Sequence, residues 1–199
     1  MKRAQSDGDS CCEKRRALLS VSTPQSLSVR EFENHVRSCQ LQKFSYDYYM
    51  HGIVEEAGEV FEEVRAKRDA NLTRDADDKV VCEIGDVLWY VTSLSLEMGV
   101  EMAMPDAWPE ATTVTSEPEV WLMAAASKLS GRVKKSLRKD KSLEEFVAAM
   151  ALHRDELLQR CAEVAAASGA SLQRCAIANV RKLKGRFERG SVQGDGDSR

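Results

Sequence analysis

The chain has 199 residues, of which 31% are charged and 43% hydrophobic, and its formal net charge at pH 7 is -3. This near balance of charge excludes a polybasic nucleic-acid binder and an acidic disordered tail. Four prolines and eleven glycines in a chain rich in Ala, Leu, Glu, Lys and Arg predict an all-α fold rather than a sheet of short strands.

The two ends of the chain are polar and show no hydrophobic periodicity. We therefore expect residues 1–27 and 190–199 to be disordered tails. The first helix is predicted over 28–43, because Ser28 and Glu31 form a capping box directly ahead of an apolar stripe.

Two longer helices should follow. One is predicted over 46–68, and the next begins in the acid-rich segment DANLTRDADD and ends before Gly99, a suitable C′ residue. Residues 103–118 contain three prolines and indicate a linker. This linker separates a first helical half, residues 28–102, from a second, residues 119–189.

The second half predicts three more helices. They are expected over 119–138, from the capping box that Ser142 opens to just before Gly169, and over 171–189. Gly58 set over Gly131 aligns the two halves as related helix pairs. Two unrelated amphipathic pairs would also align tolerably on the 3.6-residue period, so a degenerate repeat and a chance similarity both remain open.

Two acidic motifs, EEAGE at 55–59 and EIGD at 83–86, are the sharpest chemical signal. The helical period places Glu56 and Glu59 in one stripe beside an apolar face, and Glu83 and Asp86 in an equivalent stripe. If the two apolar faces pack together, four carboxylates meet at the edge of the core. There they would repel and raise one another's pKa values unless a cation neutralised them.

Oxygen ligands alone suit a hard cation, so these motifs predict Mg²⁺, with Mn²⁺ as a possible substitute. A di-iron bundle is disfavoured because neither Glu56 nor Glu83 is followed by His three residues later. For a single motif, a solvated acidic helix face would be the better interpretation. Gly58 and Gly85 indicate close helix approach or crowded ligands, because glycine inside a helix costs about 1 kcal/mol relative to alanine.

These residues carry a family resemblance. Residues 49–60, 83–90 and 179–186 resemble blocks of the MazG-like all-α nucleotide pyrophosphohydrolases, whose metal signature is the pair of acidic motifs. The resemblance is good over about 29–100 and fair over about 171–190. It implies a helical bundle of that type and Mg²⁺-dependent hydrolysis of a nucleoside triphosphate, usually a deoxynucleotide, to the monophosphate and pyrophosphate.

The resemblance also implies roles for individual residues. The implied metal ligands are Glu56, Glu59, Glu83 and Asp86. Apart from the resemblance, the reaction needs a carboxylate to accept the proton from the attacking water, and we expect Glu56 or Glu59 in this role. Asn179 and Lys182 are expected beside the nucleotide. Arg186 follows Lys182 by one helical turn and could offset leaving-group charge or cap the helix end.

An aromatic or imidazole surface is expected to stack on the base. His51 and Tyr49 precede the first acidic motif, and Trp89 and Tyr90 follow the second. His51 in such a position is more often a surface or packed residue than a ligand contact, and Trp89 favours a place in the core.

The chain departs from a simple family member in that about seventy residues separate the helix of the second acidic motif from the Asn179 helix. If the second half is a degenerate copy, the positions of Glu56, Glu59, Glu83 and Asp86 are held by Leu129, Arg132, His153 and Glu156. Such a half could not bind the same metal. Lys128, Arg132 and Lys135 could instead face the phosphates, resembling the fused dimeric dUTPases, or form a solvated helix face.

We therefore expect an enzyme of nucleotide-pool sanitation, a homodimer that binds neither nucleic-acid polymers nor membranes. A catalytically inactive helical interaction module is the alternative from another class. Phosphoribosyl-ATP pyrophosphohydrolase is weaker, because the residues after Asp86 lack the histidine of that family. Six cysteines without a C-x-x-C pair, and no long apolar run, predict a soluble cytoplasmic protein with reduced thiols.

Overall fold

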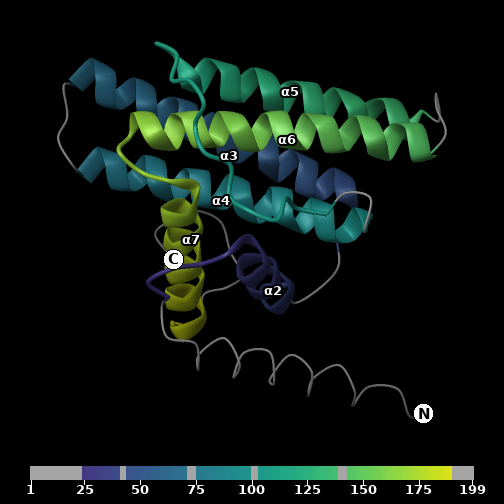
Figure 1. The fold of residues 1–199 in the computed structure, drawn as a ribbon, viewed down its shortest axis with the longest axis horizontal. Coiled ribbons are helices and arrows are strands. Elements are labelled where there is room, and N and C mark those ends of the chain that lie inside the picture. Colours follow the sequence, from purple (N-terminus) through teal and green to yellow (C-terminus); the bar gives the residue numbers. More distant parts are fainter. Residues whose placement is uncertain (1–23, 41–43, 71–74, 100–102, 139–142, 190–199) are drawn as a thin grey trace.

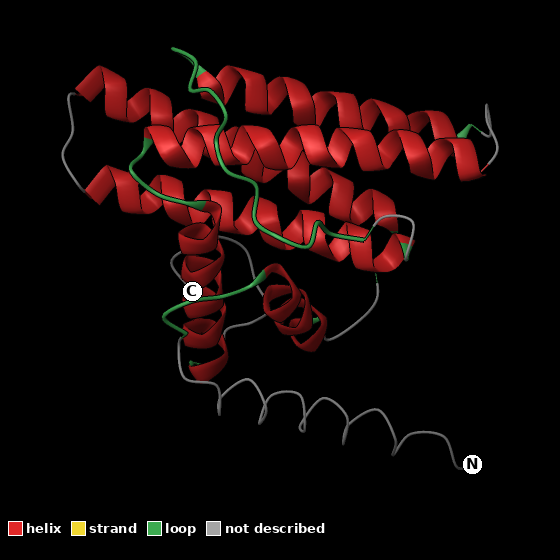
Figure 2. Cartoon of the chain, viewed as in Figure 1, coloured by secondary structure: helices red, strands yellow, loops and turns green. Residues whose placement is uncertain are grey.

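The computed structural model describes residues 24–40, 44–70, 75–99, 103–138 and 143–189, and these ranges contain helices and no strand (Figures 1 and 2). The helices are α2 (Val29–Cys39), α3 (Tyr46–Ala70), α4 (Asp75–Met98), α5 (Pro118–Leu137), α6 (Leu143–Ala167) and α7 (Leu172–Glu188). The predicted all-α fold is confirmed. Among the described helices, none is both long and apolar enough to cross a membrane.

Four helices, α3 to α6, lie side by side and form two antiparallel hairpins, α3–α4 and α5–α6 (Figure 1). The hairpins pack on each other mainly through α3 and α5. Helix α7 crosses this bundle steeply and packs on α4, with α2 beside it (Figure 1). The C-terminal helix is therefore brought against the helix that carries the second acidic motif.

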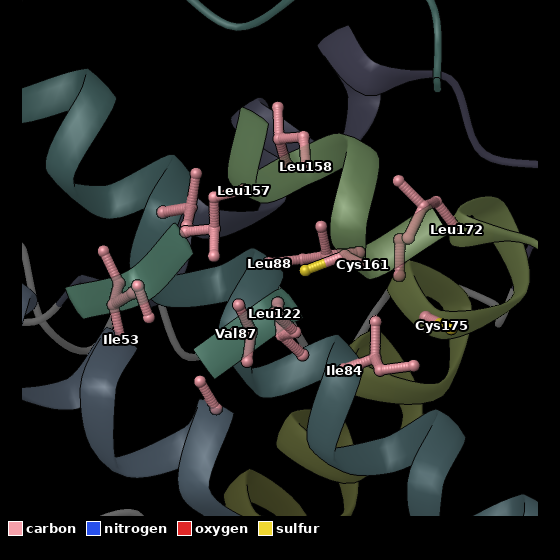
Figure 3. Packing of buried hydrophobic residues seen from close by; sticks show 14 of the residues in the cluster. Ile53, Ile84, Val87, Leu88, Leu122, Leu157, Leu158, Cys161, Leu172 and Cys175 are labelled. Atoms are coloured by element: carbon pink, nitrogen blue, oxygen red, sulfur yellow. The ribbon is translucent and has the colours of Figure 1, made fainter. Parts of the chain in front are cut away.

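The core of the bundle is built from the apolar stripes expected on α3 and α4. Ile53, Ala57 and Val60 of α3 are fully buried, as are Ile84 and the other stripe residues of α4 up to Leu94. Side chains from α3 to α7 meet in one cluster (Figure 3). Because these faces are buried together, the acidic stripes beside them lie at the edge of the same interface.

The helix boundaries follow local sequence signals. Ser28 accepts a hydrogen bond from the Glu31 backbone while Glu31 bonds back, as the predicted capping box requires. Gly99 and Gly169 have φ values of +85° and +68°, the left-handed conformation expected after a helix end. The first helix was predicted to reach residue 43, but α2 ends at Cys39. The capping box predicted at Ser142 cannot be compared, since Ser142 lies outside the described residues.

The linker crosses the bundle without regular structure and fastens α2 to it. Trp108 donates its indole N–H to the Leu27 carbonyl at 2.7 Å, and its ring meets Phe32 edge-on at 5.6 Å. Farther along, Gln159 of α6 donates to the Glu110 carbonyl at 3.1 Å. The segment predicted as a linker is therefore hydrogen-bonded both to a residue ahead of α2 and to α6.

An ion pair with one buried partner joins the two hairpins. The Arg68 guanidinium at the end of α3 donates to both carboxylate oxygens of Glu119 in the first turn of α5, at 2.6 and 3.0 Å. The side chain of Glu119 is fully buried, whereas that of Arg68 is 38% exposed. Removal of the arginine would leave an uncompensated charge in the interior.

We expect Arg68→Ala to lower the free energy of unfolding by about 3 kcal/mol, because Glu119 would lose its counter-ion. Lys79→Ala removes a lysine that is 68% exposed and lies 3.6 Å from Glu63, and it should cost no more than about 0.5 kcal/mol. Urea denaturation of the two variants measures the difference. Equal losses would show that burial of Glu119 does not matter.

Candidate metal centre

Three of the four predicted metal ligands converge in space. One carboxylate oxygen each from Glu56, Glu59 and Glu83 can be chosen so that all three lie within 4.8 Å of one another. Glu83 is buried, Glu56 is half-buried and Glu59 is exposed. The acidic cluster, defined as these three residues, thus extends from the core edge between α3 and α4 out to solvent.

The fourth predicted ligand, Asp86, lies beside the acidic cluster and is held by α7. Asn179 donates its amide to Asp86 Oδ1 at 2.6 Å, and the Lys182 ammonium donates to Asp86 Oδ2 at 2.6 Å. Lys182 Nζ also lies 3.8 Å from Glu83 Oε2. The two residues that the resemblance placed near a nucleotide are therefore in direct contact with the second acidic motif.

The crowding of these acids appears in the pKa of Glu56, which is raised to about 9. Burial is the main cause, and the charges of Asp86, Glu59 and Glu83 add to it, while Lys182 acts in the opposite direction. Carboxylate oxygens whose mutual repulsion is only partly relieved are the environment that a hard divalent cation stabilises. The residues present therefore fit such a metal.

Gly85 explains how α7 comes so close to the acids. A Cβ at this position would lie 2.6 Å from the Cys175 carbonyl oxygen and 3.0 Å from the Asn179 Cβ, so a larger residue would push α7 away. The close approach predicted from this glycine is confirmed. Gly58 differs, because a Cβ there would meet nothing within 4 Å and no crowding accounts for it.

A second glycine contact places an aromatic ring next to the acidic cluster. A Cβ on Gly52 would collide with the Tyr90 ring, so this ring rests directly on the backbone of α3. Burial raises the pKa of Tyr90, and a hydrogen bond with Tyr48 and the charge of Glu56 raise it further. Tyr49 was a candidate for base stacking, but it is 1% exposed and cannot offer a ring face.

The remaining predicted substrate residues are more dispersed. His51 is exposed on α3, one turn before Glu55, and Arg186 is half-buried on α7, one turn after Lys182. Arg132 of α5 donates its Nε hydrogen to His153 Nε2 of α6 at 3.0 Å. The described contacts thus tie Arg132 to α6 rather than to the acidic cluster.

Residues that sequence alignment places over the acidic motifs also meet in the second hairpin. Lys128 donates to Glu156 at 2.6 Å, and His153 Nδ1 lies 3.5 Å from the other oxygen of Glu156. The hydrogen bond from Lys128 is the main reason that the pKa of Glu156 lies below its usual value. At this place α5–α6 supplies its own cations, whereas α3–α4 concentrates negative charge.

Comparison with known proteins covers the first hairpin. Residues 44–105 match the family model described as the MazG nucleotide pyrophosphohydrolase domain. The chain contains a MazG-like segment. This segment includes all of α3 and α4, and therefore both acidic motifs, but ends before α5. No curated protein and no solved structure matched the chain.

The MazG-like segment confirms the resemblance noted from the sequence. It does not include α7, so the role of α7 rests on its contacts with Asp86. The sequence pointed to that role through the resemblance of residues 179–186 to the family, and Asn179 and Lys182 do lie about one turn apart on α7. The contact between Tyr48 and Tyr90 was not anticipated. The sequence could have indicated that Tyr48 lies on the same side of α3 as the acids, because it precedes Glu59 by about three helical turns.

We expect divalent metal to stabilise the protein more strongly as the pH rises. The pKa of Glu56 is about 9 in the folded state against 4.5 as its ordinary value, so without metal the folded state loses stability as the pH rises between these values. Bound Mn²⁺ would relieve this loss and displace about one proton. The melting temperature with and without Mn²⁺ at pH 6 and pH 8, and calorimetry in two buffers, measure the effect.

Glu56→Gln serves as the control for this experiment, because it removes the titrating group while keeping the shape of the side chain. The metal-dependent shift in melting temperature should then vary little between the two pH values. A shift in the wild-type protein that is the same at pH 6 and pH 8 would contradict the expected linkage.

A matched pair of glycine substitutions tests the packing of α7. Gly85→Ala should lower the free energy of unfolding by about 1–3 kcal/mol, because the added methyl group collides with the backbone of α7. Gly58→Ala adds the same group in open space and should raise it by up to about 1 kcal/mol. Chemical denaturation compares the two, and effects of the same sign would refute the steric account.

Proposed function

We propose that the protein is a Mg²⁺-dependent pyrophosphohydrolase that cleaves a deoxynucleoside triphosphate to the monophosphate and pyrophosphate. The observation that carries this proposal is the acidic cluster inside the MazG-like segment, where burial and, to a smaller extent, the neighbouring acids raise the pKa of Glu56. Mn²⁺ should substitute for Mg²⁺, because both accept carboxylate oxygens as ligands.

The metal would be held by Glu56, Glu59 and Glu83, with Asp86 as the fourth carboxylate. When bound, it would neutralise the phosphates and make a water molecule more acidic. Glu56 or Glu59 would accept the proton that this water loses as it attacks the α-phosphorus. Asp86 has the further task of orienting the α7 side chains, since each of its oxygens receives one of their hydrogen bonds.

The cations of α7 would bind the leaving group. Lys182 lies between Asp86 and Glu83, and Arg186 follows it by one helical turn, so both can approach negative charge that develops on the leaving phosphate oxygens. The Asn179 side chain is buried, and its Oδ1 accepts no hydrogen bond from the described part of the chain. This oxygen is suited to accept a hydrogen bond from a sugar hydroxyl group.

We further propose that α5–α6 is a degenerate copy of α3–α4 that holds no metal. In α5–α6, Lys128 and Arg132 supply positive charge at the positions that correspond to the acidic motifs of α3–α4. In α3–α4 the same positions would need a bound metal ion. The opposite directions of the pKa shifts of Glu56 and Glu156 support this asymmetry. One catalytic site per chain follows from it.

Nucleotide-pool sanitation, a homodimer and a cytoplasmic location remain predictions from the sequence. The four described cysteines are free thiols. Should the protein instead be an inactive interaction module, it would respond neither to metal nor to nucleotide.

The function is tested with a panel of deoxynucleoside triphosphates, including oxidised bases, in the presence of Mg²⁺. We expect pyrophosphate as the product, and a loss of about a hundredfold or more in kcat for Glu59→Gln and Asp86→Asn. Glu62→Gln, an exposed acid of the same helix, should retain full activity. Orthophosphate as the sole product, or activity in the Asp86 variant equal to wild type, would refute the proposal.

A further inference from the structure

The first turn of α3 carries an aromatic side chain that the proposed mechanism leaves unused. Tyr48 is 40% exposed. Phe44 stacks on one face of its ring, with centroids 4.1 Å apart and planes inclined by 22°. Phe44 thus holds one face of the ring, Tyr49 and Tyr90 lie beside it, and the exposed part of the side chain can receive another planar ring.

The position of Tyr48 relates it to the acidic cluster. Tyr48 and Glu59 are eleven residues apart, close to three full helical turns, so their side chains leave α3 in nearly the same direction. Glu56 is eight residues from Tyr48, a separation of about 12 Å along the helix axis. This length is comparable with the span from the base to the phosphates in an extended nucleoside triphosphate.

Tyr90 packs on the part of α3 that lies between Tyr48 and Glu56. Its ring rests on Gly52, one turn after Tyr48, and the centroids of Tyr48 and Tyr90 are 6.2 Å apart. Tyr48 and the charge of Glu56 both contribute to the raised pKa of Tyr90. Tyr90 thus contacts Tyr48 and lies close enough to Glu56 to respond to its charge.

We infer that Tyr48 is the stacking platform for the base of the substrate, whose phosphates would lie at the acidic cluster. This inference rests on the proposed function and adds to it the place of the base. Tyr49 is buried and Trp89 is half-buried against the core, so neither presents a comparable ring. Stacking on a tyrosine has no hydrogen-bond code, so all four bases should benefit similarly.

Binding of a non-hydrolysable α,β-imido deoxynucleoside triphosphate with Mg²⁺, measured by calorimetry, tests the inference directly. Tyr48→Ala should weaken binding about tenfold for each of the four bases. Tyr48→Phe keeps the ring and should bind like the wild-type protein. Trp121→Ala removes another exposed aromatic residue, 51% exposed on α5, and should have no effect.

A substrate without a base separates stacking from a general disturbance of the site. The kcat/KM for 2-deoxyribose 5-triphosphate should be the same in wild type and Tyr48→Ala, while that for the complete nucleotides falls about tenfold in the variant. Equal losses for both substrates, or a Tyr48→Phe variant as impaired as Tyr48→Ala, would overturn the stacking role.

The two proposals fail in different ways. If the wild-type protein hydrolyses nucleotides and Tyr48→Ala binds the imido analogue as tightly as wild type, the stacking platform is refuted and the enzyme activity stands. If the wild-type protein takes up Mn²⁺ but neither binds nor cleaves any nucleotide, the proposed function and the stacking platform are refuted together.

Discussion

Electrostatic repulsion between carboxylates on two packed helices is the constraint on which the site depends. Burial of the apolar faces of α3 and α4 leaves the acidic stripes no freedom to separate, because the core and the cluster share one interface. The hydrophobic energy of that interface therefore holds the acids together against their charge. A site of this kind is prepared for a cation by the folding of the chain.

Helix positions and the burial of α3 and α4 could be predicted from the sequence, because capping residues and apolar periodicity are local signals. The convergence of Glu56, Glu59 and Glu83 followed from the same periodicity. The contact of α7 with Asp86 could not be derived in this way, because the crossing of two helices depends on how distant surfaces fit. Gly85 hinted at a close approach without naming its partner.

Other features were beyond local reasoning for a similar reason. The pairing of Arg68 with the buried Glu119 joins residues about fifty positions apart, and each alone resembles an ordinary helix-surface charge. The hydrogen bond from Arg132 to His153 likewise joins residues of two different helices. In each case the partner, rather than the residue type, decides the role, and partners across two hairpins are set by the tertiary fold.

The crossing of α7 also bears on how portable the MazG-like segment is. Asn179 and Lys182 reach Asp86 from a helix that begins well outside residues 44–105. A fragment restricted to that range would keep every acid and discard the lysine that partly balances them. A gene fusion or a shortened version of the protein should therefore keep α7 together with α3 and α4, although α7 is far from them in the chain.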